Sequence, residues 1–176
     1  MWEDAGKAGL ALGLVSTTYL FVNQFISSTQ AATWIIMLLS TVLWAAKFGG
    51  CIWLMICFMK RFSRQNPQAQ SSTTFLFGMM AAALSALVYA AATFANTAFI
   101  SADAIAEQTG LMLQQMAPMM DSNSMAQMDK IMEKLPQITF FSNLIYCFCF
   151  GTILSGILSR NIPSRNPFAD NTSDEW

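Results

Sequence analysis

Four long apolar segments alternate with polar ones along the chain. They cover residues 8–26, 32–59, 74–98 and 138–159. Because a helix needs about 20 apolar residues to cross the ~30 Å hydrocarbon core of a bilayer, each segment is long enough to span a membrane. The pattern predicts an all-α membrane protein with four transmembrane helices in a bundle. We expect a single membrane domain over 1–168 and a polar tail at 169–176.

The connections between the predicted spans differ in length and composition. Only the polar residues 27–30 separate the first two spans, which predicts a tight helical hairpin. Pro67 lies between the second and third spans, where it acts as a helix breaker. The first span lacks a clearly basic run before it and an Ala-x-Ala-like cleavage site after it. We therefore interpret it as a retained span and not as a signal peptide.

A polar insertion at 101–137 separates the third and fourth spans, and its apolar residues recur at helical spacing. This spacing predicts a short amphipathic helical hairpin, whose second helix is stopped by Pro136. Seven of the thirteen methionines fall in the insertion. An apolar stripe on the membrane surface explains them without any metal. Thioethers also suit Cu(I), so soft-metal binding is the alternative, although we expect no cofactor or metal.

Composition narrows the class of protein further. The chain has 55% apolar and 11% charged residues and no histidine. An ordinary soluble domain has about 25% charged residues, so the scarcity of charge excludes a soluble globule. The absence of histidine excludes Ser-His-Asp and Cys-His catalysis and every His-ligated metal or haem. The net charge of −1 gives no basis for binding nucleic acid. All four cysteines lie in apolar segments without a CxxC motif and are expected to act as small hydrophobic side chains.

The placement of lysine and arginine predicts the orientation in the membrane. With four spans, both termini and the middle loop share one side, which carries Lys7, Lys60, Arg61, Arg64, Arg160 and Arg165. The other side carries Lys130 and Lys134. Basic residues concentrate on the cytoplasmic side of membrane proteins. We therefore expect a multi-pass protein of the bacterial inner membrane, with both termini cytoplasmic and residues 101–137 periplasmic.

Small residues recur at four-residue spacing in three of the spans. Helices in lipid associate by close packing at such residues, because burying apolar surface against another helix gains little there. The candidate packing residues are Gly9, Gly13, Gly78, Ala82, Ala86, Gly151 and Ser155. Packing within one bundle would use all of these positions. Homodimerisation through one of the stripes is the alternative.

Lys47 lies inside the second span, thirteen residues before Lys60, which is about 20 Å of helix. A charge near the middle of a bilayer costs ~3 kcal/mol on insertion scales. None of the ten acidic residues lies in a predicted span, so no carboxylate partner can be named. Three interpretations stay open. Lys47 snorkels to a headgroup; Gly49 and Gly50 kink or break the helix and supply carbonyls and water; or Lys47 and these glycines contact a ligand, an anionic lipid or a partner chain.

Other polar residues within the spans would either line a small cavity near Lys47 or make routine hydrogen bonds between helices. These residues are Ser16, Thr17, Asn23, Gln24, Ser40 and Asn143.

The order of motifs resembles a known family. A hairpin of two spans precedes the basic connector KRFSRQNPQAQSS, and a Met- and Gln-rich insertion precedes the final span FGTILSGILSR and the tail RNIPSRNPF. This layout resembles the small four-span membrane proteins of Bacteroidota that form the domain of unknown function 4199 family. The resemblance covers roughly residues 6–168. It implies an inner-membrane protein with four helices, and it implies no activity, because the family has none assigned.

Two functions fit the sequence. The first is a non-enzymatic accessory or assembly subunit that acts through helix packing with partners. The expected partners of the chain are the lipid bilayer and either a second copy in a homo-oligomer or another membrane protein. The alternative function is a small oligomeric transporter or channel with Lys47 in its pathway. An enzyme is not expected, because no histidine, carboxylate cluster within the spans or glycine-rich phosphate loop is present.

Overall fold

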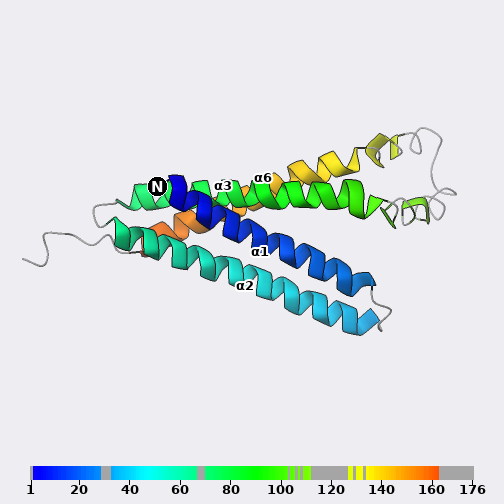
Figure 1. Ribbon diagram of the computed structural model, residues 1–176, viewed down its shortest axis with the longest axis horizontal. Coiled ribbons are helices and arrows are strands. Elements are labelled where there is room, and N and C mark those ends of the chain that lie inside the picture. The colour runs from blue at the N-terminus through cyan, green and yellow to red at the C-terminus, as the bar shows by residue number, and fades with distance from the viewer. Residues whose placement is uncertain are drawn as a thin grey trace, which may run out of the picture.

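The computed structural model describes residues 2–28, 33–66, 70–102, 104–105, 107, 109–111, 127–128, 130–132 and 134–162. Within this part of the chain, four helices are long and apolar enough to cross a membrane. They are α1 (Trp2–Ser28), α2 (Thr33–Gln65), α3 (Ser71–Ala95) and α6 (Leu135–Asn161), and α3 continues into a short π-helical turn, η1 (Asn96–Ile100). The four helices pack together, which confirms the predicted all-α fold with four apolar spans (Figure 1).

Each helix begins or ends several residues beyond the apolar segment that predicted it. At the start of α1, for example, Lys7 donates a 2.7 Å hydrogen bond to Glu3 one turn earlier. At the end of α2, Lys60, Arg61 and Arg64 continue the helix. An apolar run marks only the part of a helix that matches the hydrocarbon core, whereas backbone hydrogen bonding continues into the wetter region where charged side chains are hydrated.

Pro136 lies in the first turn of α6, which begins at Leu135. A proline is tolerated there because its missing N–H would have no partner in the helix. Helical residues at 130–132 and a turn at Lys134 precede this proline, so a helical segment ends just before it. The amphipathic hairpin predicted over 101–137, with most of its methionines, lies largely outside the described residues, and so does the polar tail at 169–176.

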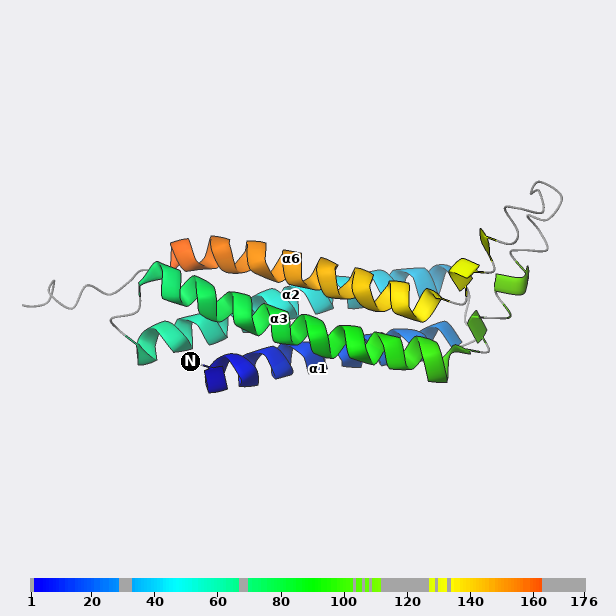
Figure 2. The same cartoon turned by 90° about the horizontal axis from the view of Figure 1, so that it is seen from above.

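Helix α3 occupies the centre of the arrangement. It packs extensively against both α1 and α6, whereas α2 packs mainly against α1 and meets α3 and α6 only sparsely. In the view from above, α3 lies between α6 and α1, and α2 lies behind it (Figure 2). The ends that carry Lys7, Lys60 and Arg160 lie together at one end of the molecule, which we call the basic end (Figure 1).

Two of the predicted packing glycines bring α1 against α3. A Cβ added to Gly9 would lie 2.7 Å from the Ala81 carbonyl oxygen, and one added to Gly13 would lie 2.7 Å from Val88 Cβ. Cβ atoms do not approach other atoms this closely, so only glycine allows the observed distance between the two backbones. Near the far end of this interface, Gln24 Nε2 donates a 2.8 Å hydrogen bond to Ser101 Oγ, just after η1.

Four of the remaining predicted packing residues lie in the α3–α6 interface. A Cβ added to Gly151 would lie 2.5 Å from Ala82 Cβ, and one added to Gly78 would collide with the Ser155 side chain. Ser155 is fully buried and its Oγ donates a 2.9 Å hydrogen bond to the Phe75 carbonyl on the neighbouring helix. Ala86 is also fully buried. The small-residue stripes are therefore used within the chain.

Helix α2 packs through bulky side chains, and all of its described buried residues lie in its second half. Its buried residues are Met55, Met59 and Phe62, and the Phe62 ring stacks on Phe77 of α3 at 4.3 Å between centroids. Among the described side chains of α2, none before Met55 is buried. The first half of α2 therefore presents apolar side chains to its surroundings, as a lipid-facing helix does.

Glycine substitutions test the close approach of α1 to α3. Gly9→Ala should lower the free energy of unfolding by about 1–3 kcal/mol, because the added methyl overlaps the Ala81 carbonyl and forces the helices apart. Gly49→Ala is the matched control, since nothing lies within 4 Å of the Cβ that it would add. Unfolding in detergent, followed by circular dichroism, measures both variants. Equal stability of the two variants would contradict the packing described for Gly9.

Candidate functional site

Lys47 lies near the middle of α2, which continues unbroken past it to Gln65. The hypothesis that Gly49 and Gly50 break the helix is therefore wrong. Nothing lies within 4 Å of the positions that a Cβ on either glycine would take, so they are open surface and bring no other helix close. The structure thus separates these two glycines from the environment of the lysine side chain.

The Lys47 ammonium lies between aromatic rings of two other helices. Its Nζ is 4.2 Å from the ring centroid of Tyr89 on α3 and 4.9 Å from that of Tyr19 on α1. Both distances are within the ~6 Å range of a cation–π interaction, which is worth about 0.5–1 kcal/mol when exposed and about 2 kcal/mol when desolvated. Lys47 therefore extends into the space between the helices and does not follow α2 toward either end.

No described carboxylate neutralises this ammonium. The described acidic residues are Glu3 and Asp4, in the first turn of α1, and Glu107, beyond the end of α3. The ion pair between Glu3 and Lys7, at 2.7 Å, lies at the basic end. The two tyrosine rings stabilise the positive charge of Lys47 through their electron-rich faces, but they leave its net charge uncompensated.

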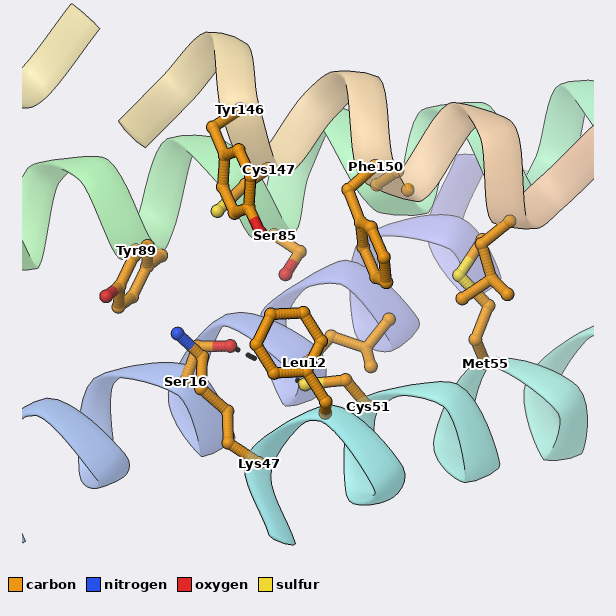
Figure 3. A pocket seen from close by; sticks show the side chains of 14 residues that line it. Leu12, Ser16, Lys47, Cys51, Met55, Ser85, Tyr89, Tyr146, Cys147 and Phe150 are labelled. Atoms are coloured by element: carbon orange, nitrogen blue, oxygen red, sulfur yellow. Dashed lines mark hydrogen bonds between the residues drawn. The ribbon is translucent and has the colours of Figure 1, made fainter. Parts of the chain in front are cut away.

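A cavity of about 80 Å³ adjoins Lys47 and is lined by residues of all four helices. A void needs only about 10–15 Å³ to hold one water molecule, so this cavity can hold several waters or part of a small ligand. Its polar lining comprises Ser16, Lys47, Cys51, Ser85, Tyr89, Tyr146 and Cys147. The Ser16 hydroxyl lies 3.7 Å from Cys51 Sγ, and the Tyr146 hydroxyl points toward Ser85 (Figure 3).

The two ends of the cavity differ in chemical character. On α2 the lining runs from Lys47 to Met55, and on α6 it runs from Tyr146 to Leu154. On α1 it runs from Ser16 to Leu12, and on α3 from Tyr89 through Ser85 to Ala82. In each of these four series, the residue named last is the one nearer the basic end. Each helix therefore places a polar lining residue far from the basic end and an apolar one nearer to it, and Phe48 adds an aromatic ring beside Lys47 on α2.

The cavity is bounded differently toward the basic end and toward the side. Toward the basic end, Met59, Phe62 and Phe77 are buried and fill the interior. At the side, α2 meets α6 through Phe48 and Phe150, whose rings contact edge to face at 5.4 Å between centroids. Because α2 and α6 touch each other sparsely, this side is the weakest wall of the cavity.

Some residues of the site were expected from the sequence and others were not. Of the polar span residues that were proposed to line a cavity, only Ser16 lines this one. Thr17 and Asn143 donate to backbone carbonyls of their own helices, at 2.9 Å each. The three tyrosines of the site were not predicted from the sequence. The chain has only three, and Tyr19, Tyr89 and Tyr146 all lie at this site, each within a different apolar span.

These features define a helical integral membrane protein whose four apolar helices surround a small cavity with a lysine at its polar end. The chain belongs to the family described as protein of unknown function (DUF4199), whose model matches residues 6–160. This match confirms the resemblance identified from the connector and the final span. No curated protein and no solved structure matches the chain significantly.

A double-mutant cycle tests the contact between Lys47 and Tyr89. We expect Lys47→Met and Tyr89→Leu to be coupled by about 1–2 kcal/mol in the free energy of unfolding, because either change alone removes the same cation–π contact. Tyr89→Phe is the control, since it keeps the ring face and should keep most of the coupling. Unfolding in detergent measures all of these variants. Additive effects of the two substitutions would show that the ammonium and the ring do not interact.

Proposed function

We propose that this protein is a non-enzymatic accessory protein of the cell inner membrane, a four-helix bundle that binds an anionic group beside Lys47. The observation that carries the proposal is an ammonium near mid-helix that faces a cavity and has no described carboxylate partner. Tyrosine rings lower the cost of placing the charge there without neutralising it. A bound anion would neutralise it.

The lining of the cavity supports binding more than catalysis. The chain contains no histidine, and the described acidic residues lie outside the cavity. Serine and cysteine side chains line the cavity, but such a nucleophile is activated by an adjacent base. Lys47 is the basic side chain of the cavity, and its ammonium lies over the rings of Tyr19 and Tyr89. The hydroxyls of Ser16, Ser85 and Tyr146 are hydrogen-bond donors that suit the oxygens of a bound anion.

A small oligomeric transporter or channel with Lys47 in its pathway is the second candidate. The position of Lys47 beside an internal cavity favours a transporter or channel. The filled interior between the cavity and the basic end argues against a continuous path through one chain, because Met59, Phe62 and Phe77 are buried there. Native mass spectrometry with lipids retained distinguishes the candidates. A symmetric homo-oligomer would support the transporter, whereas a defined complex with another membrane protein would support the accessory role.

The orientation proposed here places the basic end in the cytoplasm. It rests on the clustering of Lys60, Arg61 and Arg160 at that end. Alkaline phosphatase inserted at position 120, between α3 and α6, should be active because it would be periplasmic. The same enzyme fused after residue 162 should be inactive, and a fluorescent protein fused there should be bright. Reversed results would overturn this orientation.

Replacing Lys47 tests the binding site itself. Lys47→Gln should abolish the stabilisation of the protein by anionic ligands, because it removes the charge at similar length. Lys47→Arg should retain part of this stabilisation, since it keeps the charge. Thermal unfolding of the full chain in a neutral detergent, with and without added dodecanoate, dodecyl phosphate, acetate or inorganic phosphate, measures the effect. Stabilisation that is equal in wild type and Lys47→Gln for every anion would refute the proposed function.

A further inference from the structure

The polarity gradient of the cavity carries a further inference, which rests on the proposed function. We infer that the ligand is a single-chain amphiphile with an anionic headgroup, a carboxylate or a phosphate. Its headgroup lies at Lys47, and its hydrocarbon chain points toward the basic end and leaves the cavity between α2 and α6. The shape, the lining and the walls of the cavity each support one part of this inference.

The length of the gradient matches a headgroup followed by a short stretch of hydrocarbon chain. Lys47 and Met55 are eight residues apart on α2, which is about 12 Å along the helix axis. The ammonium and the hydroxyl donors lie at one end of the cavity, and Leu12, Met55 and Leu154 lie at the other. A compact inorganic anion would use only the polar end. An amphiphile would use both ends.

The volume favours a single chain over a two-chain lipid. About 80 Å³ accommodates a headgroup and a few methylenes, whereas pockets that enclose a whole drug-sized ligand measure about 300–1,000 Å³. The rest of the chain must therefore lie outside the cavity. The sparse contact between α2 and α6 provides that exit, with Phe48 and Phe150 at its edge.

The surroundings of the cavity favour a ligand that arrives from the membrane. The buried cluster of Met59, Phe62 and Phe77 closes the route from the basic end. The first half of α2, which borders the polar end of the cavity, presents large apolar side chains such as Trp44 to its surroundings. An amphiphile already dissolved in the bilayer reaches the space between α2 and α6 by lateral diffusion.

Ligands matched in chain length test the headgroup and the tail separately. Dodecanoate and dodecyl phosphate are the two anionic probes, and their relative affinities distinguish a carboxylate site from a phosphate site. Dodecanol and dodecyltrimethylammonium have the same chain without a negative charge. Acetate and inorganic phosphate are anions without a chain. Native mass spectrometry of the full chain in a neutral detergent counts the bound probe, for wild type, for Lys47→Gln and for the control Gly49→Ala.

We expect at least one twelve-carbon anion to bind wild type and Gly49→Ala about tenfold more tightly than dodecanol, a difference of about 1.4 kcal/mol. Lys47→Gln should lose this preference. Short anions that bind as tightly as the long ones, still dependent on Lys47, would overturn the amphiphile inference and leave the proposed function standing. Failure of every anion to bind in a Lys47-dependent manner would overturn both.

The cysteines locate the bound ligand. Cys147 lines the cavity, whereas Cys57 and Cys149 are exposed on the outer surface. The bound amphiphile should slow alkylation of Cys147 by N-ethylmaleimide about tenfold and leave Cys57 and Cys149 unchanged, as measured by peptide mass spectrometry. Leu154→Gln, which makes the apolar end polar, should weaken protection by dodecanoate. Equal protection of all three cysteines would show that the amphiphile coats the protein and does not enter the cavity.

Discussion

The arrangement of this protein depends on how closely α3 approaches α1 and α6. At Gly9 and Gly151, a single added methyl group would overlap atoms of α3. In lipid, burying apolar surface between helices gains little, so the helices are held together by this close packing and by interhelical hydrogen bonds such as the one from Ser155 to the Phe75 carbonyl. Because small residues allow α3 to approach both α1 and α6 closely, α3 forms the centre of the bundle. Its contacts with α1 and α6 determine where these two helices lie.

Helix α2 has no comparable stripe, and the cavity is a consequence. Phe62, Met59 and Met55 fill the space between α2 and the other helices near the basic end. No described side chain of α2 before Met55 is buried. In that part, α2 contacts α1 and α3 through the half-buried Lys47 and the rings of Tyr19 and Tyr89, and Cys51 Sγ lies 3.7 Å from the Ser16 hydroxyl of α1. The cavity lies where α2, which carries large side chains, meets α1 and α3 without its side chains packing between theirs.

The sequence predicted the fold better than the site. Long apolar runs identify spans because every backbone polar group in lipid must be satisfied within the segment, which leaves few alternatives to a helix. The ends of the helices were not predictable from hydropathy, because backbone hydrogen bonding continues past the apolar run. Lys47 was identified by its charge alone. Tyr19, Tyr89 and Tyr146 were not, because nothing in a one-dimensional pattern shows that residues of three helices converge.

The cost of removing an anion from water decides what can occupy the site. Two charges attract strongly at low dielectric constant, but the penalty for dehydrating both can exceed that attraction unless other hydrogen bonds satisfy the anion. Around Lys47 the hydroxyls of Ser16, Ser85 and Tyr146 can supply such bonds. A small soluble anion would still have to leave water and cross an apolar region. An amphiphile keeps its chain in an apolar environment throughout, so only its headgroup has to lose water, and the apolar end of the cavity, near Leu154, continues that environment.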